Sequence, residues 1–249
     1  MAIQKGIIKL KGKIGDISFY KTQDGHLARE KGGVDASRIA TDPAFVRTRE
    51  NGNEFGSAAS SGKVLRDALR NMLMSASDNR VTSRLTKLMN SVKNLDATSA
   101  RGLRTVGTAI ALPTAKALLK GFNFNSKAIL GGVLYKTYVV ATGTGEISIN
   151  GLVPINDIAF PSGATHLNIK GAWAKIDFET GIYDVQYSKV VNLPIDGTSK
   201  DVVLTPTAAP VGTGTDTYLL MIEFLQEVNT VQYSLKNGAY NALSIVEVA

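Results

Sequence analysis

The spacing of apolar residues changes once along the chain, and the change predicts two kinds of structure. Between Asp42 and Gly121, apolar residues recur every three to four positions, as one face of a helix requires. From about Lys127 onward they alternate with polar residues, as in half-buried strands. We therefore predict an α+β protein: an N-terminal β-hairpin, a helical region, and then a C-terminal antiparallel β-sandwich of the Ig-like or jelly-roll-like type.

The N-terminal hairpin is predicted from a turn signal between two β-prone segments. Residues 14–21 and 26–31 flank Asp24-Gly25. An Asp-Gly pair suits a type I′ turn, because both central residues of that turn need positive φ. An isolated hairpin is marginally stable in water, so we expect this one to pack on another element or on another copy of the chain.

Helical patterns fill the region between the hairpin and residue 126. The first begins at Asp42-Pro43, where aspartate can cap the helix and proline suits its first turn. Gly52 and Gly56 follow, one turn apart, and they either permit close approach of another backbone or break the helix. The clearest amphipathic pattern follows Asp78, with a face predicted to be buried that consists of Val81, Leu85, Leu88, Met89 and Val92.

The C-terminal half is predicted to hold seven or eight short strands. Residues 218–225 are almost continuously apolar, which indicates a central strand that is buried on both faces. Residues 231–235 and 243–248, with Asn237-Gly238 between them, are predicted to form a closing hairpin. The run TGTGE at 142–146 favours a hairpin connection over a phosphate-binding loop, which would need a lysine and a following helix.

Charge divides the 249-residue chain near the same point. Residues 1–127 contain 22 Lys and Arg against 10 Asp and Glu, a net charge of +12, whereas residues 128–249 contain 6 against 11, a net charge of −5. We therefore predict two domains: a basic β-hairpin plus helical region at 1–126 and a β-sandwich domain at 127–249. Halves of opposite charge can attract one another head to tail.

Residues that carry chemistry are scarce. The chain has no cysteine, which excludes disulfides, thiolate metal sites and cysteine nucleophiles. Its two histidines, His26 and His166, do not belong to a ligand cluster or to a serine-hydrolase pattern. We therefore expect no enzymatic activity, no catalytic or metal-binding residue and no cofactor. A site assembled from distant carboxylates stays open.

The sequence contains neither a secretory signal nor an apolar segment of membrane-spanning length. We expect synthesis in the cytoplasm and no membrane span. Placement in a virion or in an extracellular assembly stays open.

Three stretches resemble an uncharacterised family of Bacteroidota proteins. They are residues 12–21 (GKIGDISFYK), 42–51 (DPAFVRTREN) and 231–235 (VQYSL). The resemblance spans most of the chain. It implies a bacterial or phage origin and no assigned activity, cofactor or catalytic residue.

The first function hypothesis is a non-enzymatic structural subunit of a larger assembly, of the virion, tail or extracellular filament type. Such a subunit would self-associate into a homo-oligomer through the N-terminal hairpin, the helices and the sandwich. The candidate assembly contacts are Ile17, Phe19, Tyr20, Leu27 and Arg29.

The alternative is a nucleic-acid-binding or packaging protein that uses the basic half, because phosphate neutralisation requires such charge. Solvated helix faces with local ion pairs, such as Lys63 with Asp67, explain the same residues. A third class is a carbohydrate-binding sandwich with Trp173 and nearby tyrosines as its platform. The candidate nucleic-acid contacts are Arg47, Arg49, Arg66, Arg70, Arg80, Arg84 and Lys87.

Overall fold

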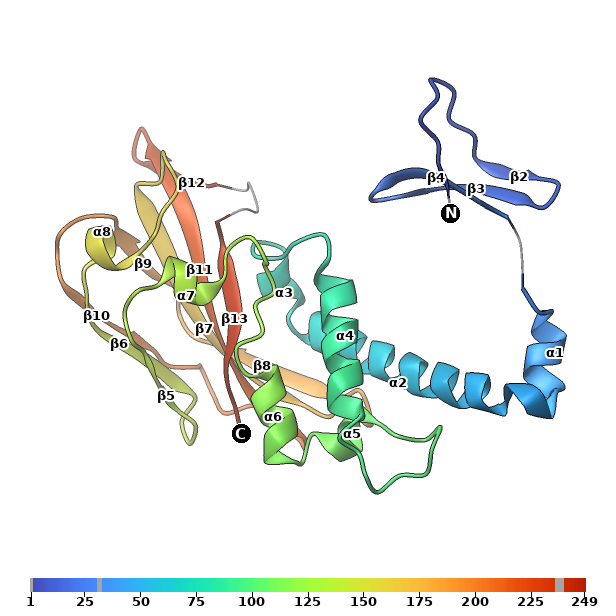
Figure 1. Cartoon of the computed structure of the whole chain (residues 1–249). Helices are drawn as coiled ribbons and strands as arrows, with labels where there is room; N and C mark the ends of the chain where they lie inside the picture. Colours follow the sequence, from blue (N-terminus) through green and yellow to red (C-terminus); the bar gives the residue numbers. More distant parts are fainter. Residues whose placement is uncertain (1, 31–32, 236–239) are drawn as a thin grey trace. The chain divides into compact units, whose positions relative to one another are not determined.

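The computed structural model describes residues 2–30, 33–235 and 240–249 (Figure 1). The chain divides into two compact units, unit 1 (Met1–Arg49) and unit 2 (Glu50–Ala249). Helices and antiparallel sheets are mixed, which agrees with the predicted α+β class. Among the described residues, no helix combines the length and the apolar character needed to cross a membrane.

Unit 1 holds a four-stranded antiparallel sheet in the order β1-β4-β3-β2. The central strands β3 and β4 pair from Ile17↔Glu30 to Thr22↔Gly25, so Gln23 and Asp24 form the two-residue connection. The strands are β1 (Ala2–Ile3), β2 (Gly12–Ile14), β3 (Ile17–Thr22) and β4 (Gly25–Glu30).

Two short helices follow, each started by an aspartate cap. The Asp35 carboxylate accepts a hydrogen bond from Ser37 N at the start of α1 (Ala36–Thr41), and Asp42 accepts one from Ala44 N at the start of η1 (Pro43–Phe45). None of the described residues of unit 1 is buried. Unit 1 therefore has strands and helices but no core of its own.

Helices α2 to α6 of unit 2 cover one face of its larger sheet, whereas α7 packs in the core on the other face. The longest, α2, is unbroken at Gly52 and Gly56, and a Cβ added at either glycine would meet nothing within 4 Å. The helices are α2 (Val46–Ala68, which begins in unit 1), α3 (Arg70–Leu73), α4 (Val81–Lys93), α5 (Val106–Ala109), α6 (Pro113–Leu119), α7 (Leu130–Val133) and α8 (Pro154–Asp157).

Two antiparallel sheets make up the rest of unit 2 (Figure 1). The larger is ordered β12-β11-β7-β8, with β13 also paired to β11 and β9 also paired to β7; the smaller is ordered β10-β6-β5. The strands are β5 (Val139–Ala141), β6 (Glu146–Leu152), β7 (His166–Ile176), β8 (Tyr183–Tyr187), β9 (Val191–Pro194), β10 (Lys200–Leu204), β11 (Thr215–Val228), β12 (Val231–Ser234) and β13 (Ala242–Val248).

The larger sheet divides its side chains between two cores. Successive residues of a strand point to opposite faces. On β11, Leu219 and Met221 pack with the helices, whereas Leu220 and Ile222 pack with β6 and β10 of the smaller sheet. The predicted central strand at 218–225, buried on both faces, is therefore confirmed.

The amphipathic pattern after Asp78 forms α4, and its apolar face enters the helical core. Leu85 and Met89 are fully buried, as predicted, whereas Leu88 is half-buried at the edge of the cluster. Both buried side chains pack against Gly62 of α2, where an added Cβ would lie 3.6 Å from Leu85 Cγ. α4 and α2 therefore pack against each other at the centre of this core.

The observed division of the chain differs from the predicted one. The helices between residues 50 and 126 share one cluster with Ala174, Ile176 and Ile245 of the larger sheet, so no boundary falls at 126/127. The change of apolar period near residue 127 marks the passage from helix to strand within one core. Periodicity reports local structure, and it does not report which elements share a core.

The predicted closing hairpin also differs. β12 and β13 each pair with β11, at residues 225–228 and 217–222 respectively. The tight turn lies instead between β11 and β12, at Asn229 and Thr230, which both have positive φ. Asn237-Gly238, predicted as the turn, lies outside the described residues.

A substitution of Leu85 tests the packing of α4. Leu85→Asp buries an unpaired charge and removes packing, so it should cost about 3 kcal/mol or more. For a unit of this size, that loss lowers the melting temperature by about 6–12 °C in differential scanning calorimetry. Thr82→Asp on the exposed face of the same helix is the control and should change little. Equal effects of the two variants would contradict the buried position of Leu85.

The shared core also predicts how truncated chains behave. A chain of residues 127–249 exposes the apolar face that the helices cover, so it should bind a hydrophobic dye and unfold without a sharp transition. A chain of residues 50–249 keeps both cores and should unfold cooperatively. A sharp calorimetric transition for residues 127–249 would restore the boundary predicted from the sequence.

Candidate assembly surface

The sheet of unit 1 carries apolar side chains on both faces. Directly paired residues of antiparallel strands point to the same face. Ile3 pairs with Leu27, and Leu27 pairs with Tyr20, so these three share a face. We call it the tyrosine face, and it also carries Ser18 and Arg29, which pair with each other.

The opposite face is equally apolar. Ile14 pairs with Ile17, and Ala28 pairs with both Phe19 and Ala2. We call this surface, formed by Ala2, Ile14, Ile17, Phe19 and Ala28, the phenylalanine face. Both faces therefore present apolar side chains, with Lys13 and Arg29 also on the tyrosine face and Lys21 and Glu30 also on the phenylalanine face.

The five predicted assembly contacts fall on different faces. Ile17 and Phe19 lie on the phenylalanine face, while Tyr20, Leu27 and Arg29 lie on the tyrosine face. There the Arg29 guanidinium lies 5.5 Å from the centroid of the Tyr20 ring, a cation–π distance. The five residues thus belong to one sheet but cannot meet a single partner surface.

The predicted nucleic-acid contacts are more dispersed, and Arg84 and Arg49 among them bind protein groups. Arg84 donates to Asn123 O at 2.7 Å, to Asp78 Oδ2 at 2.5 Å and to Phe124 O at 2.9 Å. In unit 1, Arg49 donates to the carbonyl oxygens of Ile39 and Asp42, at 2.7 and 3.0 Å. These guanidinium groups hold segments of the fold together.

The other basic candidates of unit 2 lie in separate places. Arg66 and Arg70 line one hollow, with Asp67 between them, and Asp67 is paired with Lys63 at 2.5 Å. This ion pair confirms the one predicted from the sequence. Lys87 lines a different groove, and Arg80 precedes α4. Arg47, the remaining candidate, belongs to unit 1.

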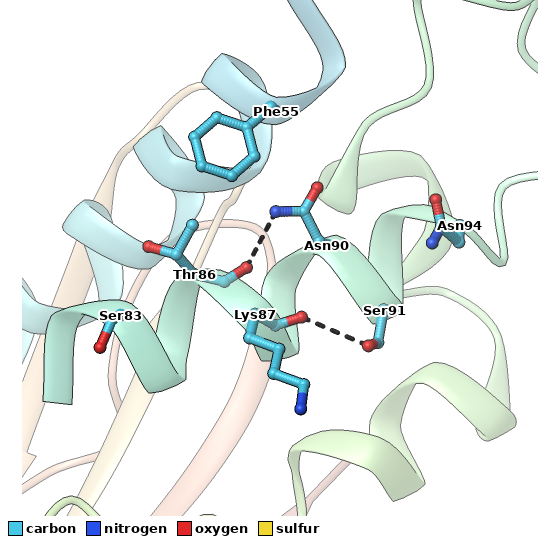
Figure 2. Close-up of a pocket in the computed structure, with 7 residues that line it drawn as sticks. All are labelled: Phe55, Ser83, Thr86, Lys87, Asn90, Ser91 and Asn94. Carbon is cyan, nitrogen blue, oxygen red and sulfur yellow. Dashed lines mark hydrogen bonds between the residues drawn. The ribbon is translucent and has the colours of Figure 1, made fainter. Parts of the chain in front are cut away.

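The groove beside Lys87 lies between α2 and α4 and has a volume of about 500 Å³ (Figure 2). Several polar side chains along it bond back to their own helix: Asn90 Nδ2 donates to Thr86 O, and Ser91 Oγ donates to Lys87 O. Its lining residues are Phe55 from α2 and Ser83, Thr86, Lys87, Asn90, Ser91 and Asn94 from α4. The groove offers hydrogen-bonding groups, one ammonium group and one aromatic ring.

Trp173 does not form the predicted carbohydrate platform. Its side chain is only 7% exposed, its indole Nε1 donates to Asp216 Oδ1 at 2.7 Å, and its ring stacks on Tyr218. The loop between β5 and β6 closes over it, and a Cβ at Gly145 would lie 2.3 Å from the indole ring. This loop is the run at 142–146, so the prediction of a hairpin connection is confirmed. The platform prediction was wrong because residue type alone does not distinguish a buried indole from an exposed one.

The sequence analysis missed a buried ionic cluster around Glu54. The Glu54 carboxylate is only 2% exposed and accepts hydrogen bonds from Lys93 Nζ at 2.6 Å, from Arg104 Nε and Nη2 at 2.8 and 2.7 Å, and from Gly102 N at 2.8 Å. The hydrogen bonds from Arg104 outweigh burial and, with those from Lys93 and Gly102, lower the pKa of Glu54 from 4.5 to about 2. The helical register could have predicted that Glu54 is buried, since Glu54 lies on the same face of α2 as Ala58 and Leu65.

Asp96 extends this cluster along the chain that follows α4. Burial raises the pKa of Asp96, but hydrogen bonds from Ser99, Thr98 and Thr105 outweigh it and hold the pKa well below its usual range. The two carboxylates fasten α2, α4 and the segment up to residue 105 to each other. Because their oxygens are occupied by protein donors, we interpret the cluster as a structural clamp. In the described part of the chain, no group of three or more acidic or histidine side chains could hold a metal ion.

Comparisons with family models, with curated proteins and with solved structures found no match for this chain. The resemblance to a Bacteroidota family therefore stays a prediction.

Removing the Glu54 charge tests the clamp. Glu54→Gln leaves Lys93 buried without its counter-charge, so it should cost about 3 kcal/mol or more in urea unfolding at pH 7. Glu247→Gln, which affects the exposed pair with Lys120, is the control and should cost about 1 kcal/mol or less.

The pH dependence follows from the lowered pKa. Ionised Glu54 stabilises the fold fully above the pKa that it has in the unfolded chain, about 4.5, and this contribution is lost as the pH falls toward about 2. The Glu54→Gln variant should therefore lose less stability than the wild type between about pH 5 and 2. Parallel pH profiles of the two proteins would contradict the role given to Glu54.

Proposed function

We propose that the chain is a non-enzymatic structural subunit that self-associates, and that unit 1 is its assembly element. The observation that carries the proposal is that no described residue of unit 1 is buried, although its sheet is apolar on both faces. A small sheet gains independent stability only when a hydrophobic face is covered. The missing cover must therefore come from residues outside unit 1.

Covering these faces would release considerable free energy. Burying one isoleucine or phenylalanine side chain contributes about 1.5–3 kcal/mol. The phenylalanine face alone offers Ile14, Ile17 and Phe19. Three such side chains would contribute about 4.5–9 kcal/mol, the free energy of a millimolar to micromolar contact, before the cost of association is subtracted.

Face-to-face contact is favoured over strand addition. The edge strands β1 and β2 span only two and three residues. Short edge strands offer little main chain to a neighbouring strand. The predicted assembly contacts Ile17 and Phe19, and Tyr20 with Leu27, are placed to act through the two faces of the pair β3–β4.

A second copy of the chain is the partner that charge favours. Residues 1–49 contain ten Lys and Arg against five Asp and Glu, a net charge of +5, and residues 128–249 have a net charge of −5. Copies can therefore attract one another in a head-to-tail sense, which closes into a ring or continues as a filament. In this proposal the two sheets of unit 2, packed as the sandwich that the sequence predicts, form the body of the subunit. The assembly is of the virion, tail or filament type.

The runner-up, a nucleic-acid-binding or packaging protein, draws less support from the geometry. Arg84 and Arg49 are engaged by carbonyl and carboxylate oxygens, and Arg66 with Arg70 lies apart from Lys87. Phosphate binding requires cations that follow the backbone of the nucleic acid.

Deleting residues 1–33 tests the role of unit 1. We expect the full chain to sediment as an oligomer in analytical ultracentrifugation, and the truncated chain to be a soluble monomer because unit 2 keeps both of its cores. Apolar contacts are not screened by ions, so the full chain should remain assembled at about 1 M salt.

Ile182→Ser in the full chain is the control, since Ile182 is an exposed apolar residue of unit 2. It should leave the assembly unchanged. A full chain that stays monomeric at high concentration and binds DNA with a steep salt dependence would replace this proposal with the packaging role.

A further inference from the structure

A closed loop projects from the sheet of unit 1 between β1 and β2. Its base is fixed by Gln4: Leu10 N donates to Gln4 Oε1 at 2.8 Å, and Gln4 Nε2 donates to Leu27 O of β4 at 3.0 Å. Gln4 N also donates to His26 O at 2.9 Å, and the Lys9 ammonium donates to Gln4 O. The base of the loop is therefore held to the sheet, while the tip of the loop extends away from the sheet.

The tip of this loop consists of Ile7 and Ile8. Their exposed fractions are 103% and 80%, so neither side chain is covered by the rest of the molecule. Lys5, Lys9 and Lys11 flank them in the sequence. The loop thus presents two bulky apolar side chains within a positively charged surround, which suits an apolar hollow with an acidic rim.

Unit 1 also contains such a hollow. It has a volume of about 630 Å³ and is lined by Ala2, Asp16, Ile17, Ala28, Arg29 and Glu30. Ala2, Ile17 and Ala28 belong to the phenylalanine face, and the short side chains of the two alanines leave the space open. Asp16 and Glu30 contribute two negative charges against the one positive charge of Arg29. The volume falls within the range of sites that enclose small apolar groups.

We infer that the tip of the loop, Ile7 and Ile8, inserts into the hollow on the phenylalanine face of unit 1 in a second copy of the chain. The inference rests on the proposed self-association and assigns its contact to unit 1 of both copies, where the attraction is local, between the loop lysines and Asp16 with Glu30, and does not use the opposite net charges of the two ends of the chain. The apolar tip matches the alanine-lined hollow, and the lysines of the loop match Asp16 and Glu30. The loop of the same copy leaves the hollow open, because its tip extends into solvent from a base that Gln4 fixes.

The contact is heterologous, because a loop on one copy meets a hollow on the next. Each copy carries one loop and one hollow, so every copy can bind two neighbours. Contacts of this kind generate rings when the rotation closes and filaments when it does not. A symmetric dimer, in contrast, would use the same patch on both copies.

The experiment uses one loop variant and two hollow variants of the full-length chain. In the loop variant, Ile7→Ser with Ile8→Ser removes the apolar tip. In the hollow variant, Ala28→Trp fills the hollow. A second hollow variant, Asp16→Lys with Glu30→Lys, reverses the charge of the acidic rim without changing the apolar surface.

Each variant should weaken self-association as measured by sedimentation. For the loop variant, the dissociation constant should rise by at least about 100-fold. Ile182→Ser is the control for loss of an exposed isoleucine and should assemble like the wild type.

Mixing the variants distinguishes this contact from any other. The loop variant keeps a functional hollow, and the hollow variant keeps a functional loop. An equimolar mixture should therefore form a one-to-one dimer and nothing larger, although each variant alone stays monomeric. Monomers in the mixture, or oligomers of either variant alone, would overturn the inference.

Cross-linking locates the contact, since the natural chain has no cysteine. An Ile8→Cys protein mixed with an Ala28→Cys protein should give a disulfide-linked heterodimer on mild oxidation. A disulfide that forms only within one chain carrying both substitutions would show that the loop folds onto its own sheet, and it would overturn the inference.

The results also separate this inference from the proposed function. If the loop variant and both hollow variants assemble as well as the wild type, self-association stands but uses another surface. If the wild type is monomeric at every concentration tested, both the inference and the proposed function fail.

Discussion

A sheet with apolar side chains on both faces must be covered on both faces, and the two units of this chain differ in how far their own residues meet that requirement. In unit 2, the long strands β7 and β11 direct alternate side chains into two cores, so that helices cover one face and the smaller sheet covers the other. In unit 1, the strand pair β3–β4 is apolar on both faces, yet none of its described residues is buried. The structure therefore combines one sheet whose two faces are both buried with another whose described residues are all exposed or half-buried.

The Glu54 cluster explains why unit 2 can serve as a rigid body. Breaking a buried pair of charges is costly, because one partner is left uncompensated in a medium that solvates it poorly. Glu54 binds Lys93 of α4 and Arg104 of the following segment, which fixes α2 against both. Arg84 similarly joins α4 to the chain beside β13, through Asp78 and Phe124 O. Charged groups that the sequence presented as a nucleic-acid surface are thus used in part to hold helices to the sheet.

Sequence patterns predicted the parts of this fold that depend on local spacing. The burial of Leu85 and Met89 follows from helical period, and the double burial of residues 218–225 follows from a continuous apolar run. The division of the chain and the environment of Trp173 depend on which distant elements meet, and periodicity carries no such information. Of the candidate site, the sequence predicted five contacts that lie on the unit 1 strands, and their distribution over two faces requires the pairing register. The exposed tip at Ile7 and Ile8 and the hollow beside Ala28 appeared only with the structure.

The lack of a core in unit 1 has a consequence for how copies would assemble under the proposed insertion. A unit that gains its stability from a neighbour must be ordered when it binds, and this ordering costs conformational entropy. When two free copies meet, unit 1 of each copy would have to become ordered for a single contact. A copy that joins an existing end, in contrast, meets a hollow that the previous contact has already stabilised. Starting an assembly is then less favourable than extending one. The short edge strands β1 and β2 act in the same direction, because they limit strand-to-strand association of free copies. Under the proposed insertion, a chain whose unit 2 has its own cores and whose unit 1 has none would stay dispersed at low concentration and still add to an existing end.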